Sequence, residues 1–465
     1  MRKLADLAAA LQAVLVNAAE RLARPSGFVK RASKMTGPRF VQSLVFGSLS
    51  QPALHLRHLA QTAALGGVEI SPQGIDQRFS PASVALLRGV LEVVVGTVVS
   101  QSLDSSLGAA ESTTAAVTPV VEPVVEPVVQ PAVIPAVLER FTHVELIDSS
   151  VIQLPQELAG EFPGCNNAEG TTAALKLDVV FDLRSGSLRG PEVRPGRAYD
   201  GAAEVARQMP ERGGLRIQDL GYFSLDRLAE ISAAGGFWLS RYKGGTHLYD
   251  EHQQRIDLLR LLNSSDVRES TLLLGTRHLA VRLLAEPVPP QLASERRRKL
   301  RLKASKHGRT PSAEALALCG WNLLLTNAPA AMLSLPEACA LMRARWQIEL
   351  LFKLWKSDLQ IDAWRSSNPW RILSETYAKL IAATLQHWIL CAGLWQIPDR
   401  SLRKAAAVVR TCAVMLLCAL ANTKQLRAVL QKILDGMRVA CRLDRRRKNP
   451  STYQRLVAAS KTPVA

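Results

Sequence analysis

Cysteine and histidine are scarce in this chain, and neither occurs in a metal-binding or disulfide pattern. The 465 residues contain seven cysteines and eight histidines, with no Cys-x2-Cys pair and no His-rich stretch beside a cysteine. An odd number of cysteines without paired spacing argues against a disulfide framework, and the missing ligand pairs argue against structural zinc. The composition therefore favours a reducing compartment such as the cytoplasm.

Long uninterrupted hydrophobic runs are also absent. The two longest apolar stretches cover residues 84–100 and 380–395; the first contains Arg88 and Glu92, and the second contains a Gln-His pair. Neither reaches the roughly eighteen apolar residues that a membrane-spanning helix needs. We interpret both stretches as buried helices and expect no membrane association.

Acidic residues are in deficit. Lys and Arg total 58 against 40 Asp and Glu, which leaves a net charge of +18 and a pI near 9.9. So many positive side chains repel one another unless a polyanion binds to the surface, and nucleic acid is the usual polyanionic partner. An anionic membrane surface is the alternative. A chain of this length is expected to form two or three folding units.

Residues 1–100 are predicted to form a helical N-terminal DNA-binding domain. Ser71 and Ser80 each precede a proline, which is the pattern of a helix N-cap followed by proline at the first helical position. Two short helices joined by a tight turn would form a helix-turn-helix. Its exposed polar residues would be Gln73, Asp76, Gln77 and Arg78. A plain helical bundle explains the same pattern equally well.

Residues 101–138 are predicted to form a Ser- and Pro-rich linker. From Pro119 a proline recurs at every fourth residue up to Pro131. Each proline fixes φ and removes a backbone donor, so this segment is predicted to be extended and to carry no chemistry.

Strand patterns begin after the linker, and acids follow two of the strands. Residues 144–147 lead into Asp148, and residues 214–218 lead into Asp219; strands at 172–183 and from 188 are joined by a turn. Carboxylates at strand ends point into the crevice where ligands bind α/β sheets. Helix caps and turn formers are the alternative interpretation.

A helix predicted from Ala338 to about Ile361 carries a charged stripe. At about 100° per residue, four side chains fall within an arc of roughly 60°. These are Met342, Arg345, Glu349 and Lys356. A second face is available for the core and consists of Trp346, Leu350 and Leu354. A surface helix with ordinary ion pairs one turn apart would show the same stripe.

Three segments together resemble the DDE transposases of bacterial insertion sequences. They are Asp148-Ser-Ser150, Gln218-Asp-Leu-Gly-Tyr-Phe-Ser224 and Arg345-Trp-Gln-Ile-Glu-Leu-Leu-Phe-Lys-Leu-Trp-Lys356. The last is similar to the group with a Tyr-x2-Arg-x3-Glu-x6-Lys signature, and the resemblance covers about residues 140–395. The signature tyrosine is Met342 here, and a thioether cannot donate a hydrogen bond to a phosphate.

The resemblance implies an α+β or α/β fold with an RNase H-like catalytic core. The core would comprise residues 139–235 and 329–395, interrupted by a mostly β insertion at 236–328 and followed by a basic helical region at 396–465. Its acids Asp148, Asp219 and Glu349 would hold two Mg²⁺ ions, with Mn²⁺ as a substitute. The DNA phosphates would be bound by Arg345, Lys353 and Lys356.

Further DNA contacts are expected from aromatic and basic residues. Trp321 matches the position of a tryptophan that, in the family this chain resembles, stacks on a flipped base; a buried core tryptophan is the alternative. Additional candidates are Met342, Tyr222, Arg241, Arg296, Arg297, Arg298 and Lys299. A second basic run at 445–448 belongs to the same class of contact.

The resemblance implies cut-and-paste transposition, with strand cleavage, hairpin formation and strand transfer. The partners would be the terminal inverted repeats and target DNA, bound by a homodimer in the bacterial cytoplasm in association with the nucleoid. One alternative is a structure-selective nuclease. The other is a decayed transposase that binds DNA without cutting it, to which Met342 and the repeated linker lend weight.

Overall fold

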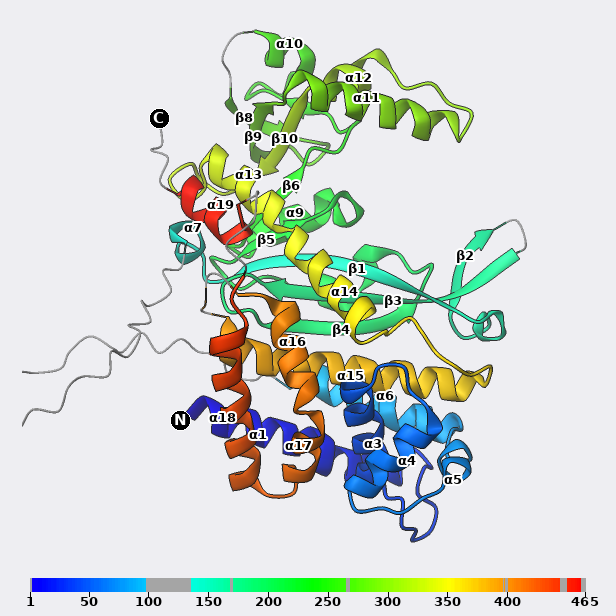
Figure 1. Cartoon of the computed structure of the whole chain (residues 1–465). Coiled ribbons are helices and arrows are strands. Elements are labelled where there is room, and N and C mark those ends of the chain that lie inside the picture. The colour runs from blue at the N-terminus through cyan, green and yellow to red at the C-terminus, as the bar shows by residue number, and fades with distance from the viewer. Residues whose placement is uncertain are drawn as a thin grey trace, which may run out of the picture.

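The computed structural model describes residues 2–97, 135–167, 170–264, 268–395, 397, 400–443 and 450–460. A mixed β-sheet with helices on both faces lies above a half of the molecule that is entirely helical (Figure 1). The predicted proline-rich repeat and the basic run at 445–448 lie outside the described residues. Among the helices that are described, none combines the length and apolar character needed to cross a bilayer.

The ten strands of the described residues form one continuous sheet. Their order is β2-β3-β1-β5-β6-β10-β9-β8-β7, with β4 pairing on β3. The bounds are β1 (Val144–Leu154), β2 (Pro163–Asn167), β3 (Gly170–Asp182), β4 (Leu188–Pro195), β5 (Leu215–Gln218), β6 (Phe237–Arg241), β7 (Leu248–Tyr249), β8 (Glu269–Leu274), β9 (Leu279–Pro287) and β10 (Trp321–Thr326). The predicted hairpin after residue 183 is confirmed, and β1, β5 and β6 run parallel. The mixed sheet with flanking helices is consistent with the expected core.

The segment 236–328 differs from the expected mostly β insertion. Its first strand, β6, is parallel to β5 and so belongs to the central sheet, while β10, β9, β8 and β7 continue the same sheet by antiparallel pairing. It also contains α10 (Leu258–Asn263), α11 (Pro290–Ser305) and α12 (Ala313–Leu318). The edge of β6 would expose unpaired backbone groups, and pairing with β10 satisfies them.

Helices cover both faces of the sheet. Alternate side chains of β1 therefore pack against helices on opposite faces. Leu146 and Ile152 point to the face that carries α14 (Trp346–Asp358) and α15 (Pro369–Leu394), within the largest hydrophobic core. Ile147 points to the opposite face, where it packs with α8 (Glu204–Arg207). Because successive strand residues face opposite ways, Asp148 lies on the same face as α14.

The N-terminal helices form a bundle rather than a helix-turn-helix. They are α1 (Arg2–Gln12), α2 (Ala19–Ala23) after a π-helical turn, α3 (Gly37–Ser50), α4 (Leu56–Leu65), α5 (Pro72–Asp76) and α6 (Pro81–Gly96). The predicted caps are confirmed, since Ser71 accepts from the Gly74 N–H and Ser80 from the Ser83 N–H. However, α5 is little more than one turn, and the apolar face of α6 is buried against α15. Both helices are therefore packed into the helical half, α5 against α4 and α6 against α15.

Both ends of the chain contribute to the helical half. Its C-terminal part is formed by α16 (Leu402–Thr411), α17 (Ala413–Ala419) and α18 (Thr423–Ala440), while α19 (Thr452–Ala459) packs against α13 (Leu335–Ala344) near the sheet. A short helix, α7 (Ala136–Glu139), precedes β1. Contacts of α1 with α18 and of α3 with α17 place the two ends side by side (Figure 1).

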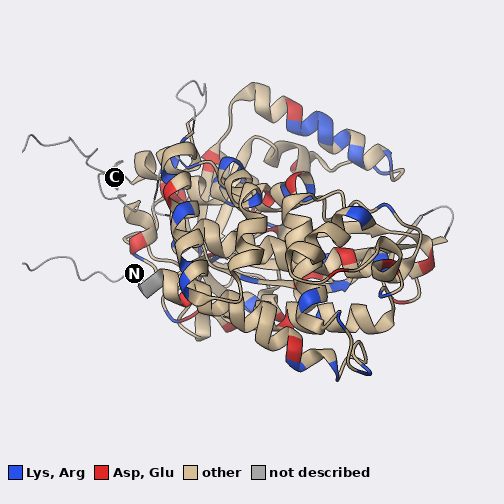
Figure 2. Ribbon diagram, turned by 60° about the horizontal axis from the view of Figure 1, so that its bottom comes forward, with Lys and Arg blue, Asp and Glu red and all other residues tan. Residues whose placement is uncertain are grey.

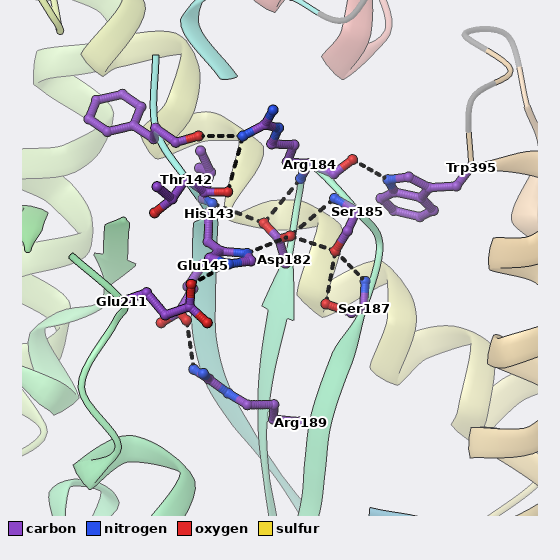
Figure 3. Close-up of polar contacts among 12 residues, drawn as sticks. Thr142, His143, Glu145, Asp182, Arg184, Ser185, Ser187, Arg189, Glu211 and Trp395 are labelled. Carbon is purple, nitrogen blue, oxygen red and sulfur yellow. Dashed lines mark hydrogen bonds and ion pairs between the residues drawn. The ribbon is translucent and has the colours of Figure 1, made fainter. Parts of the chain in front are cut away.

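A polar network fixes the beginning of β1 against the β3–β4 turn (Figure 3). Asp182 accepts hydrogen bonds from the Val144 N–H (2.9 Å) and from the Ser185 hydroxyl (2.5 Å), and it lies 3.4 Å from the His143 ring. Burial alone would raise the pKa of Asp182, but the hydrogen bonds from His143 and Ser185 hold it below its usual value. At the end of α15, the Trp395 indole donates to the Arg184 carbonyl at 3.1 Å. The start of β1 is thereby tied to α15.

The buried His387 provides a prediction about stability and pH. Its Nε2 lies 2.7 Å from the Gly186 carbonyl, and burial lowers its pKa to about 4. Between pH 6.5 and 4 the unfolded chain binds this proton and the native chain does not, so acidification destabilises the native state. We expect a loss on the order of 3 kcal/mol across this window.

The measurement compares urea unfolding of the wild type and His387→Gln at pH 7, 5.5 and 4.5. The glutamine amide can still donate to the Gly186 carbonyl but does not titrate. The free energies of unfolding of the two proteins should therefore converge as the pH falls. A constant difference at all three values would contradict the prediction.

Candidate active site

Asp148 and Asp219 lie at the same level on neighbouring parallel strands. The last paired residues of β1 and β5 are Ile147 and Gln218, and each aspartate immediately follows its paired residue. Neighbouring strands are about 4.8 Å apart, so the equivalent register brings the two carboxylates to one place at the sheet surface. The prediction had β1 ending at Asp148, whereas β1 continues to Leu154 along β3, and only its pairing with β5 ends there.

The predicted single helix around Glu349 is in fact two helices that meet at Arg345. The first, α13, ends at Ala344, and α14 begins at Trp346, which places Glu349 in its first turn. The Ile348 N–H bonds to the Arg345 carbonyl three residues earlier, so the junction is a tightened turn. Because the Arg345 backbone stays in the helical region, the side chains of Arg345 and Glu349 still lie one turn apart.

The Arg345 guanidinium joins acids from distant parts of the chain. One nitrogen donates to Asp148 Oδ2 at 2.6 Å and the other to Glu349 Oε1 at 2.7 Å. The Arg345 side chain is only 12% exposed, against 19% for Asp148 and 32% for Glu349, so both ion pairs are largely shielded from water. The planar guanidinium suits this geometry because it presents several donors in fixed directions.

Asp148 is the electrostatic centre of the site. Burial raises its pKa above the usual value for an aspartate, while Arg345 and the Ser149 N–H act in the opposite direction. The charges of Glu349 and Asp219 raise the pKa further. Both carboxylates are therefore close enough to Asp148 to repel it, and a cation placed among the three would relieve this repulsion.

The donor set fits hard divalent cations. Three carboxylates converge, and Mg²⁺ prefers oxygen ligands while it keeps several waters. Within the described residues, no three His, Cys, Asp or Glu side chains are gathered closely enough to surround a single ion. The remaining ligands of any ion held there would come from water or substrate.

Two lysines of α14 lie along the same side of the site. Lys356 donates to the Val151 carbonyl of β1 at 2.9 Å, so it fastens α14 to the strand that carries Asp148. Lys353 is exposed to solvent. The structure therefore places Lys356 where it supports the site and leaves Lys353 available for a phosphate.

The prediction that one face of α14 is buried in the core is only partly confirmed. Leu354 is buried as expected, but Trp346 is 55% exposed and Leu350 is 38% exposed. The helix instead packs against the core through residues that include Ile348 and Leu351. Sequence reasoning thus missed an exposed indole next to Arg345. Met342, a predicted DNA contact, is 6% exposed and packs in the main core.

Two other predicted contacts are found in different settings. Tyr222 is buried, and its hydroxyl donates to Asp178 at 3.3 Å behind the catalytic strand, so it offers no surface to DNA. Burial raises the pKa of Asp178 to about 6, opposed by Arg194. Arg241 lies at the end of β6 and is exposed.

The basic stretch on α11 divides into two kinds of residue. Arg296 donates to the Trp321 carbonyl at 3.1 Å and to the Asn322 side chain at 2.8 Å, and Arg297 donates to the Leu316 carbonyl. These two arginines hold the helix on β10 and α12. Lys299 pairs with Glu295 on the surface, and Arg298 has no ion pair among the described residues. Trp321 is partly buried against the second hydrophobic core.

Comparison with known proteins places this site within a described family. A family model for the transposase DDE domain matches residues 140–385, which is more than half of the chain. The chain is 28% identical over 391 residues to a transposase for insertion sequence element IS231E from Bacillus thuringiensis subsp. finitimus, covering 79% of this chain and 75% of the relative. A transposase for insertion sequence element IS1151 from Clostridium perfringens is 23% identical, with 81% and 78% covered.

Proposed function

The chain belongs to the family of transposase DDE domains, and we propose that it carries out cut-and-paste transposition of an insertion sequence. The steps would be strand cleavage, hairpin formation at the element's end and strand transfer into a target. The observation that carries the proposal is the Arg345 guanidinium between Asp148 and Glu349, which joins residues almost two hundred positions apart in sequence. With Asp219 beside Asp148, the three acids form the constellation that such chemistry needs.

Asp148, Asp219 and Glu349 would hold two Mg²⁺ ions, or Mn²⁺ as a substitute. When bound, such ions activate an attacking hydroxyl or water and stabilise the leaving oxygen of an in-line phosphoryl displacement. The chain's own residues orient the site. Arg345 sets the distance between β1 and α14, Lys356 anchors the same helix to β1, and the exposed Lys353 binds a phosphate of the DNA.

The DNA partner is proposed to be double-stranded, comprising the element's terminal inverted repeats and the target. Figure 2 shows Lys and Arg following one another along α11, beyond the insertion strands. The residues of this helix that do not hold β10 are suited to phosphate contacts, because such contacts give affinity without sequence choice. Cutting both ends of an element requires two active sites, so we propose a homodimer.

Base stacking during hairpin formation is assigned to Trp321. Loss of an indole that stacks on an extruded base costs about 1–3 kcal/mol. We therefore expect Trp321→Ala to lower hairpin formation about tenfold or more while the first nick proceeds normally, as measured on a radiolabelled element end. Trp346→Ala is the matched comparison, because Trp346 is the exposed tryptophan beside Arg345. Loss of hairpins in the Trp346 variant alone would contradict the assignment to Trp321.

The decisive experiment incubates the full chain with Mg²⁺ and a duplex that carries the element's own end joined to flanking DNA. A transposase yields a nick, then a hairpin on the element end, then products joined to a target plasmid. A structure-selective nuclease cuts branched DNA and yields no joined product, and a decayed copy binds the end without cutting it. Either of the last two results would replace the proposal.

A further inference from the structure

The net positive charge of the protein is concentrated in two segments that contain no acid. Residues 21–68 carry seven Lys and Arg and no Asp or Glu, and residues 400–434 also carry seven and none. Together they supply 14 charges, against a net charge of +18 for the whole chain. Both segments belong to the helical half, far along the sequence from the three catalytic acids.

Many of these cations are exposed and have no acidic partner. On α2, the loop after it and the start of α3 they are Arg21, Arg24, Lys30, Arg31, Lys34 and Arg39. On α18 they are Lys424, Arg427 and Lys432. None of these nine side chains forms an ion pair with a carboxylate of the described residues, whereas exposed cations elsewhere, such as Arg88 and Arg277, do. We call the nine residues the terminal basic surface.

A continuous path of contacts links the two groups. The Arg39 guanidinium donates to the Gly66 carbonyl at the end of α4, and the Leu417 side chain of α17 lies against Gly66. Three residues further on, the Leu420 carbonyl accepts from Gln12 at 2.9 Å. The same glutamine accepts from Thr423 at 3.0 Å, directly before Lys424. These contacts thus connect Arg39, at the start of α3, with the beginning of α18 at the other end of the chain.

We propose that the terminal basic surface binds the backbone of double-stranded DNA outside the catalytic site. Unpaired surface cations that repel one another are stabilised by a polyanion, and duplex DNA presents one negative charge per about 1.7 Å of its axis. The proposal rests on the proposed function for the choice of DNA as the polyanion. It also relocates the expected N-terminal DNA contact from residues 70–80 to the region around the α2–α3 loop, and adds α18 from the other end of the chain.

The test uses the full chain and three triple variants. The first is Lys30→Gln/Arg31→Gln/Lys34→Gln, and the second is Lys424→Gln/Arg427→Gln/Lys432→Gln. The matched control is Arg88→Gln/Arg277→Gln/Arg438→Gln, which removes the same charge from exposed cations that already pair with acids. Binding to a 40-bp duplex is measured by fluorescence anisotropy between 50 and 300 mM KCl, and thermal unfolding checks that each variant is folded.

Each test variant should reduce the slope of log affinity against log salt by about two to three, since each phosphate contact contributes about 0.9. At 150 mM salt this corresponds to a loss of affinity of about tenfold or more, while the control changes little. Wild-type slopes in both test variants would overturn the proposal. The proposal would also be overturned if the test variants lost binding to single-stranded RNA or to anionic vesicles while their binding to the duplex stayed unchanged.

Failure of this surface and failure of the proposed function give different results. Asp148→Asn, which removes a catalytic carboxylate, should keep the wild-type salt slope. If the wild type never cuts DNA but the two test variants lose duplex binding, the terminal basic surface stands and the transposase proposal falls. If the wild type cuts DNA and the salt slopes of the two test variants are unchanged, the transposase proposal stands and the terminal basic surface falls.

Discussion

Cleavage of an element end should fall at least about a thousandfold in Asp148→Asn, Asp219→Asn and Glu349→Gln, because each loses a charge that neutralises metal ions during phosphoryl transfer. The amides keep the shape of the acids, so the fold should survive. Asp219 is the most informative of the three positions. Asp148 and Glu349 also pair with Arg345, whereas Asp219 forms no ion pair with the described residues. The measurement is single-turnover strand cleavage with saturating Mg²⁺.

The control for this experiment is Asp226→Asn, which changes an exposed aspartate that pairs with Arg277 on the surface. It should cut DNA at the wild-type rate. All four variants should bind the duplex normally, so a loss of cleavage can be attributed to chemistry rather than affinity. Normal cleavage by the Asp219 variant would remove that residue from the proposed site.

Replacing Arg345 by lysine should reduce cleavage about a hundredfold although the charge is kept. The guanidinium reaches Asp148 at 2.6 Å and Glu349 at 2.7 Å through two nitrogens, and a single ammonium cannot reproduce both directions. Misplacement of α14 by about 1 Å is enough to cost a factor of this size. We also expect a higher Mg²⁺ concentration for half-maximal rate, because the two carboxylates are no longer held at a fixed separation.

The matched control is Arg343→Lys, two residues earlier in α13. Arg343 is 57% exposed and lies 3.7 Å from Glu286, so a lysine can replace it without loss. Equal effects of the two substitutions would show that any arginine near the helix junction matters only for stability. A thermal unfolding measurement on both variants separates that case from the positioning role.

The three acids could be proposed from the sequence because strand patterns and motif spacing are local properties. Asp148 and Asp219 each come directly after the last residue at which β1 and β5 pair, and Glu349 lies one turn after Arg345 in a helical pattern. The caps at Ser71 and Ser80 were predictable for the same reason, since a cap depends on only the next few residues. What these patterns could not give is which face of α14 meets the core. Trp346 and Leu350 are exposed, whereas Ile348 and Leu351 of the same helix are buried.

Composition also had limits that are visible at particular residues. Tyr222 and Met342 have chemistry that could serve DNA, yet both are buried, because burial depends on which elements pack above them. Arg296 and Arg297 belong to a run of basic residues in the sequence, but their hydrogen bonds hold α11 against β10 and α12. A charge count cannot separate a structural arginine from one that is available for phosphate.

The sequence by itself determined the family and the cationic character of the chain and predicted the three acids, since these depend on residue type and on spacing over short distances. Only the tertiary structure decided how distant parts meet. It placed Asp148 against Arg345 of a helix almost two hundred residues later, and it brought the acid-free segments 21–68 and 400–434 together in one helical half. The physical reason is that side-chain burial and strand register are set by packing of the whole chain, and no local pattern encodes them.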